Sequence, residues 1–337
     1  MSIPTPLKFL NPGWFSLVMG LSGLALAWRS ADGVLGDMAS GVALVLGLLA
    51  ALAFSVLAGA SILRWNRHAQ ALAEDLRHPV RHAFVATIPV SMLLLSALAQ
   101  SFDLGGVAVD LLWWTGSLCQ LWVTVWVLSR WLAPQTGAAA NAGGLWPGIT
   151  PLLLIAVVGN VVAPLAGIGL GHSFWSAAQF GIGVLFWPLV LGLTLVRRLA
   201  HGPLPDRLLP TWFITVTPPS IIGLVLLQYQ APAPLVQGCW GIAMVTLLWV
   251  GSQSKRMVGQ AFGLPFWAVS FPLAAFSSLT LTLAVLLALP SLQTVGVLAL
   301  AVTSLVVFGL CLATTRGLRN GTLLAPEPVA NIIPATV

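Results

Sequence analysis

Charged residues are scarce in this chain. Asp, Glu, Lys and Arg together make up 7% of its 337 residues, whereas soluble domains contain about 25%. So few charges do not cover a globule with polar surface, which excludes a water-soluble fold. Because apolar side chains make up 58% of the sequence, we predict that most of the molecular surface faces lipid.

Cysteines and clusters of titratable residues are also few. Cys119, Cys239 and Cys311 lie singly within apolar runs, which argues against a disulfide framework or a metal site. Paired carboxylates and metal-type histidine clusters are missing, so we expect no catalytic residue, no metal and no cofactor. The basic residues are not interleaved with aromatic residues, so nucleic acid is not an expected partner.

Ten apolar runs are long enough to cross a lipid bilayer as helices, each crossing needing roughly 20 residues. Helix is the expected structure because a spanning segment must satisfy its own backbone. The expected spans are residues 12–28, 38–63, 83–101, 107–130, 148–170, 173–197, 209–229, 234–253, 265–288 and 292–315. They predict an all-α protein with one transmembrane domain, residues 1–320, and a disordered cytoplasmic tail, residues 321–337.

The basic residues fall on one side of these ten spans, apart from Arg29. On that side lie Lys8, Arg64, Arg67, Arg77, Arg81, Arg130, Arg197, Arg198, Arg207, Lys255, Arg256, Arg316 and Arg319. The positive-inside rule places this side, with both termini, in the cytoplasm. The spans then form five hairpins that begin and end in the cytoplasm, and the inner (plasma) membrane is the expected location.

Odd-numbered and even-numbered spans differ in composition. The odd spans carry small residues at helical spacing and most of the prolines, and we expect helix kinks at Pro89, Pro164, Pro218 and Pro272. The even spans carry tryptophans, which suit lipid and its interface. We infer an inner ring of odd helices around a central pore and an outer ring of even helices. The alternative is that small residues only allow close helix packing.

No Asp, Glu, Lys or Arg lies clearly inside a span, although proton-coupled transporters and intramembrane proteases need ionisable groups at depth. A path lined by uncharged groups, with a positive cytoplasmic rim, suits weakly bound anions. The pore-lining candidates are Gly13, Ser16, Gly20, Thr87, Ser91, Asn160, Thr215, Ala275 and Ser278. The hydroxyls and amides among them have an alternative role, which is hydrogen bonding to a neighbouring helix.

Phe271 is the candidate gate. It lies one residue before Pro272 in the ninth span, and Ala275 and Ser278 follow one and two turns later. A ring that projects into a tube with small walls closes it by sterics and dewetting. The alternative is an ordinary packing aromatic.

Three motifs resemble the tellurite-resistance/dicarboxylate transporter family, which includes TehA-like proteins and is related to plant guard-cell slow anion channels. They are Pro12-Gly13-Trp14-Phe15 with Gly20, His78-Pro79-Val80-Arg81 with Phe84 and Pro89, and Trp267-Ala268-Val269-Ser270-Phe271-Pro272. The resemblance implies five hairpins around a central pore and a homotrimer with one pore per subunit. It also implies that Phe271 matches the gating phenylalanine and that Ser16 occupies a small pore-facing position.

The leading hypothesis is therefore a channel or transporter for small inorganic or organic anions, with a link to tellurite resistance. A coupled C4-dicarboxylate or sulfite transporter is the second hypothesis, although proton coupling needs a titrating group that the spans do not offer. A membrane enzyme is the third, and His78, Arg81 and His82 are its only candidate cluster.

Overall fold

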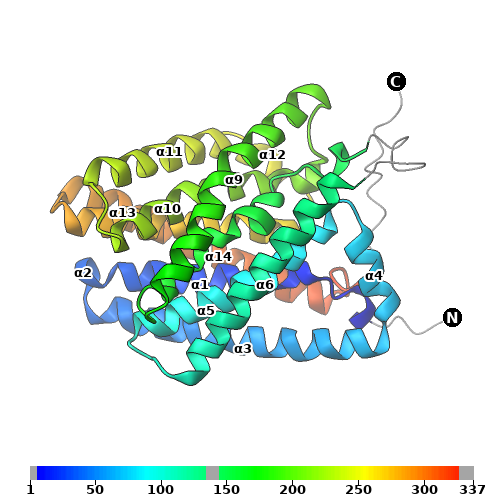
Figure 1. Cartoon of the computed structure of the whole chain (residues 1–337), viewed down its shortest axis with the longest axis horizontal. Helices are drawn as coiled ribbons and strands as arrows, with labels where there is room; N and C mark the ends of the chain where they lie inside the picture. The colour runs from blue at the N-terminus through cyan, green and yellow to red at the C-terminus, as the bar shows by residue number, and fades with distance from the viewer. Residues whose placement is uncertain (1–5, 134–143, 326–337) are drawn as a thin grey trace.

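The computed structural model describes residues 6–133 and 144–325, and within these ranges every regular element is helical, as expected. Of the expected disordered tail, residues 326–337 lie outside the described ranges. The helices run between two ends of the molecule, with α4 (Ala69–Arg77) at one end and α2 (Asp32–Leu35) at the other (Figure 1).

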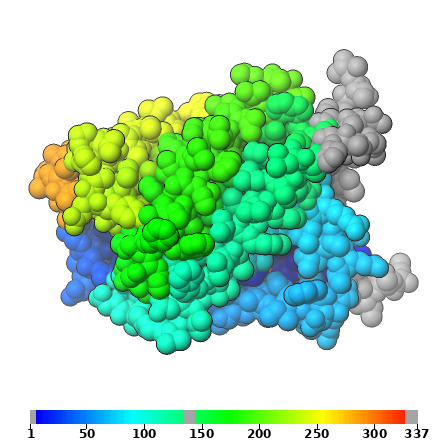
Figure 2. Space-filling model, in the orientation of Figure 1, coloured from blue at the N-terminus to red at the C-terminus, as the bar shows by residue number. Residues whose placement is uncertain are grey.

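Long helices with large exposed apolar surfaces form the outside of the molecule. They are α3 (Asp37–Arg67), α6 (Val107–Leu132), α9 (Ser173–Ala200), α11 (Ala233–Gly251) and α14 (Pro290–Arg319). Only 17–39% of the residues in their most apolar stretches are buried. Figure 2 shows the green and teal atoms of α9 and α6 across the face toward the viewer. These helices correspond to the even-numbered spans.

Shorter helices are buried between them. They are α1 (Ser16–Ser30), α5 (Thr87–Ser101), α10 (Thr217–Gln228) and α13 (Ser270–Leu286). Each continues directly from a 3₁₀-helix, namely η2 (Pro12–Phe15), η3 (Arg81–Ala86), η7 (Asp206–Val216) and η8 (Leu264–Val269). In the last three combined stretches, 72–78% of the most apolar residues are buried. Runs of 3₁₀-helix longer than a turn are uncommon and often mark hinges, so their repetition here is a distinctive feature of the fold.

The fifth expected span is an interrupted helix. After η4 (Trp146–Gly148) it consists of the π-helix η5 (Leu154–Val158), the 3₁₀-helix η6 (Gly159–Val162) and α8 (Pro164–Gly167). Pro164 lacks the N–H that would continue the hydrogen-bond ladder, which accounts for the new start at α8. Residues 149–164 are all buried, so the interruption lies inside the protein, where such breaks are tolerated.

Eight helical stretches among the described residues are long and apolar enough to cross a membrane. The first and fifth expected spans are not among these eight. The first is helical from Pro12 to Ser30, as η2 followed by α1, and the fifth is interrupted, with a shorter apolar stretch from Leu154 to Gly167. The sequence therefore predicted the helical class correctly, and it missed that the fifth span is broken.

Contacts between loops show which helix ends lie together. Arg130, near the end of α6, donates from Nη1 to the Leu76 carbonyl of α4 over 2.8 Å. At the opposite end, His172 Nε2 before α9 lies 3.2 Å from Asp110 Oδ1 in the first turn of α6. α9 therefore runs from the α2 end back to the α4 end of the molecule, where its last turn carries Arg197 and Arg198.

A cavity between the buried helices

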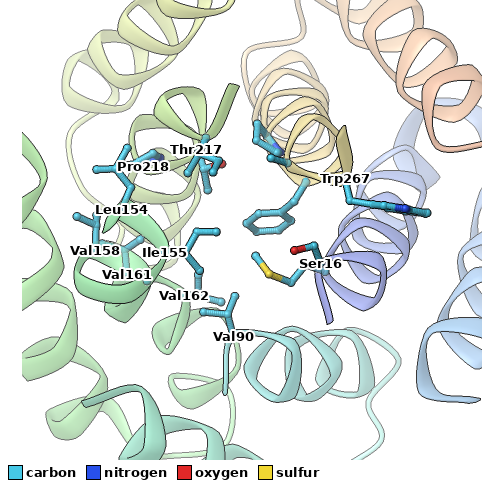
Figure 3. Close-up of a pocket in the computed structure, with 16 residues that line it drawn as sticks. Ser16, Val90, Leu154, Ile155, Val158, Val161, Val162, Thr217, Pro218 and Trp267 are labelled. Carbon is cyan, nitrogen blue, oxygen red and sulfur yellow. The ribbon is translucent and has the colours of Figure 1, made fainter. Parts of the chain in front are cut away.

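A narrow cavity of about 40 Å³ lies at the centre of the buried helices (Figure 3). Five buried segments contribute to its wall, namely the four shorter helices with their 3₁₀-helices and the interrupted fifth span. In chain order the lining residues are Ser16 and Met19; Val90; Leu154, Ile155, Val158, Gly159, Val161 and Val162; Ile214, Thr217 and Pro218; and Trp267, Ala268, Phe271 and Pro272. Most of these residues lie close to the point where a 3₁₀- or π-helix changes into the next helical piece. A water molecule needs about 10–15 Å³ of such space, so the cavity accommodates only a few waters.

The wall of the cavity is apolar and carries no ionisable side chain. Its polar side-chain groups are the hydroxyls of Ser16 and Thr217 and the indole N–H of Trp267. The Trp267 Nε1 donates to Thr314 Oγ1 of α14 over 2.9 Å, and its indole points away from the other lining residues in Figure 3. An ion that entered here would therefore meet hydrophobic surface and two hydroxyls.

Phe271 lies in this wall at the start of α13, and its side chain is 5% exposed. The ring packs against Gly23 of α1. A Cβ atom on Gly23 would lie 2.6 Å from Phe271 Cδ2, closer than atoms in real contacts approach. The absence of a side chain at Gly23 therefore creates the space in which the ring lies.

Four of the residues predicted from the sequence line the cavity: Ser16, Pro218, Phe271 and Pro272. Two predicted glycines lie behind the wall. The side chains of Ser270 and Trp267 occupy the space beside Gly20, and the Phe84 ring occupies the space beside Gly13.

The predicted hydroxyl residues of the third and seventh spans donate to backbone carbonyls. Thr87 Oγ1 lies 2.7 Å from the carbonyls of both Pro12 and Phe84, and Ser91 Oγ lies 2.7 Å from the Thr87 carbonyl and 3.2 Å from the Phe15 carbonyl. These bonds join α5 to η2, which is the alternative role left open for them. Thr215 Oγ1 donates to the Trp212 carbonyl over 2.6 Å in its own helix.

The remaining predicted residues are buried near the cavity but are not part of its wall. Ala275 and Ser278 are 3% and 4% exposed on α13. Pro89 is buried in α5, where its carbonyl lies beside Gly116 of α6. Pro164 begins α8.

Asn160 belongs to a group of polar side chains that hold the interrupted helix. Its Nδ2 donates to Thr124 Oγ1 of α6 over 2.8 Å and to the Val157 carbonyl over 2.9 Å. Thr124 Oγ1 donates in turn to the Ala156 carbonyl, and Gln120 Nε2 lies 3.1 Å from the carbonyls of both Ile155 and Ala156. Side chains of α6 therefore bind the carbonyls of the π-helix that faces the cavity.

Sequence reasoning missed Gln120 and Thr124, and it placed Trp113 among the tryptophans that suit lipid. Trp113 is fully buried, and its Nε1 donates to the Ala163 carbonyl just before Pro164 over 2.9 Å. The sequence does contain a pattern that could have indicated this role. Trp113, Gln120 and Thr124 are three hydrogen-bond donors at helical spacing in α6, and the next span contains prolines. Such residues match the carbonyls that a broken helix leaves free.

Replacing Gln120 by leucine is expected to loosen the wall of the cavity. The change removes the donor to the Ile155 carbonyl, and an unpaired buried polar group costs about 1–3 kcal/mol. Amide hydrogen exchange in peptides covering residues 149–163 should accelerate about tenfold or more. Gln179→Leu is the matched control, because Gln179 is equally buried but donates from α9 to the Ser117 carbonyl of α6. Equal exchange in both variants would contradict this role of Gln120.

Comparison with known proteins places the chain among anion channels and transporters. Residues 10–315 match the SLAC1 family, described as voltage-dependent anion channel. An uncharacterised transporter of Methanocaldococcus jannaschii is 24% identical over 298 residues, which cover 80% of this chain and 82% of the relative. A tellurite resistance protein TehA homolog of Haemophilus influenzae is 22% identical over 281 residues, 82% of each chain. The S-type anion channel SLAH2 of Arabidopsis thaliana is 24% identical over 214 residues, 63% of this chain and 40% of the relative.

Proposed function

Because the chain belongs to the SLAC1 family of voltage-dependent anion channels, we propose that it moves small anions across a membrane along the cavity between its buried helices. The observation that carries this proposal is the cavity itself, which takes residues from all five buried segments and none with an ionisable side chain. Such a wall binds ions weakly, and weak binding permits rapid passage.

The direction of the buried helices favours anions over cations. The 3₁₀-helices η3, η7 and η8, which precede α5, α10 and α13, begin at the end of the molecule that carries most basic residues. Helix N-termini carry a partial positive charge, so these helices and the nearby arginines give that mouth a positive potential. The effect concentrates anions at the mouth without binding them inside the cavity.

We place the gate at Phe271. Its ring lies in the wall of a cavity of only about 40 Å³, and a narrow hydrophobic constriction closes a pore by excluding water. The one other aromatic residue of the wall, Trp267, is held by its hydrogen bond to Thr314, and the remaining wall residues are aliphatic or small. Movement of this one ring therefore changes the width more than movement of any neighbour.

The proposal includes the topology expected from the sequence. It places ten crossings as five hairpins in the inner membrane, with odd-numbered helices inside and both termini in the cytoplasm. The contrast in burial between the two sets of helices supports this arrangement. The resemblance adds a homotrimer with one pore per subunit, and a link to tellurite resistance would follow from anion flux.

The test is flux through purified protein in liposomes, with chloride, nitrate or sulfate on one side and potassium or sodium as the only cation. Anion flux that is independent of the cation supports the proposal. A coupled dicarboxylate or sulfite carrier would instead show saturating flux that follows an imposed pH gradient. The cavity wall offers no titrating group for such coupling.

Substitution of Gly23 by alanine is expected to raise the basal anion current about tenfold. The added methyl group overlaps the Phe271 ring and forces it out of its place. Overpacking costs about 1–3 kcal/mol, and about 1.4 kcal/mol corresponds to a factor of ten. The double variant with Phe271→Ala should carry the same current as Phe271→Ala alone, because the ring is no longer there. Additive effects in this double-mutant cycle would show that Gly23 does not act through the ring.

A further inference from the structure

A second cavity, of about 210 Å³, lies away from the central one at the α4 end of the molecule. It is formed where α9 ends, where η7 begins and where α11 leads into α12 (Ser254–Val258). Its wall consists of Arg198, Pro203, Leu204, Leu209, Trp212, Trp249, Val250, Gln253, Arg256 and Met257. None of these residues lines the central cavity.

Two arginines and an amide provide the polar side of this cavity. Arg198 and Arg256 are exposed, and within the described part of the chain neither has a carboxylate within ion-pair distance. Gln253, also in the wall, lies on the turn between α11 and α12. Guanidinium groups bind phosphate oxygens through paired hydrogen bonds. The two arginines thus match a phosphodiester.

The other side of the cavity is apolar and continues onto the surface that faces lipid. Leu204, Val250 and Met257 form a buried floor, at 3%, 3% and 5% exposure. Trp212 and Trp249 meet edge to face with ring centroids 5.7 Å apart, and indoles favour the membrane interface. Along α11, Val245 and Leu248 are more than half exposed, so an acyl chain would continue along this helix.

We propose that this cavity binds the headgroup of an anionic phospholipid from the leaflet at the α4 end. The phosphate lies between Arg198 and Arg256, the tryptophan pair covers the glycerol region, and the acyl chains lie on α11. Basic pockets between membrane helices are suited to such headgroups. A free phosphate ion would use the arginines but not the apolar wall that leads into the bilayer.

The test is native mass spectrometry of the purified full-length chain with added phosphatidylglycerol or phosphatidylethanolamine. The variant carries Arg198→Gln and Arg256→Gln together. The control carries Arg67→Gln and Arg319→Gln, which remove the same charge from exposed positions outside the cavity. We expect the wild type and the control to retain phosphatidylglycerol, and the cavity variant to bind it about 30-fold more weakly. Phosphatidylethanolamine should bind weakly to all three.

Equal binding of phosphatidylglycerol by the cavity variant and the control would overturn the proposal, as would equal binding of the two lipids by the wild type. Displacement of the lipid by excess inorganic phosphate would assign the arginines to a small anion instead. Unfolding temperatures without added lipid show that each variant is folded. An Arg198→Lys, Arg256→Lys variant should recover part of the affinity. The readout is binding, so it is independent of whether the chain conducts anions.

Discussion

Anion current through Phe271→Ala is expected to exceed the wild-type current at least about tenfold when purified protein is reconstituted in planar bilayers. Lowering a barrier by about 1.4 kcal/mol raises a rate tenfold. The wild-type ring lies in the wall of a cavity of about 40 Å³, which leaves an anion no room to keep part of its hydration. Alanine leaves space for water, and a hydrated constriction conducts where a dry one does not.

The matched control is Phe276→Ala. Phe276 is also on α13 and is 4% exposed, but it stacks with Trp240 of α11 at a centroid distance of 6.3 Å and lies outside the cavity wall. Both substitutions remove a buried ring and are expected to destabilise the protein by about 3–5 kcal/mol or less. Only the change at Phe271 should raise the current, so a general loosening of α13 is distinguished from removal of a gate.

The outcomes separate two levels of the proposal. Current that is unchanged in Phe271→Ala, with a conducting wild type and correct insertion, would reject the gate and leave the anion channel intact. Absence of anion flux in both proteins would reject the channel itself. Current carried by potassium rather than chloride would contradict the charge arrangement at the mouth.

The sequence predicts the helical class of the central segments, because a long apolar run must satisfy its own backbone hydrogen bonds. Proline and small residues in the odd-numbered spans fit helices that start in 3₁₀ turns and approach one another closely, as Gly20 does beside Trp267. The same pattern led to the prediction that Phe271 is a gate; the structure places its ring in the cavity wall, and the gate itself stays a prediction. Prolines at helix starts and small residues at helical spacing are properties of neighbouring residues in the chain, so they can be identified from the sequence alone.

Contacts between distant helices are a different matter, because no local pattern specifies the partner. Gly23 reads as one more member of a small stripe, and only the structure places the Phe271 ring against it. Trp113 and Trp122 both lie in α6, yet one is fully buried and the other is 60% exposed. The rotation of the helix about its axis decides this difference, and composition alone does not reveal that rotation.

The hydroxyl residues illustrate the same limit. Ser16 lines the cavity, whereas Ser91, which looks equivalent in the sequence, lies within hydrogen-bond distance of two backbone carbonyls, that of Thr87 at 2.7 Å and that of Phe15 at 3.2 Å. A freed backbone carbonyl is a strong acceptor in a membrane interior, and a hydroxyl within reach of one binds it. Which hydroxyl is within reach depends on the packing of α5 against η2.

Substitution of Asp75 by asparagine is expected to lower the free energy of unfolding by about 3–5 kcal/mol. Asp75 is 2% exposed at the end of α4 and forms ion pairs with Arg64 at 2.6 Å and with Arg81 at 3.0 Å. Removing one partner leaves the buried Arg64 charge uncompensated, which is the costly case for a buried pair. Arg64 Nε also donates to the Lys8 carbonyl over 3.1 Å, so the loss extends to the N-terminal segment.

The control for Asp75 is Asp32→Asn at the opposite end of the molecule. Asp32 pairs with Arg29 at 3.0 Å, but its side chain is 40% exposed, and exposed pairs contribute little because water screens them. The unfolding temperature in detergent should therefore fall strongly for Asp75→Asn and hardly change for Asp32→Asn. Small and similar decreases of the unfolding temperature for both variants would mean that water reaches Arg64. Packing rather than charge would then stabilise this end of the protein.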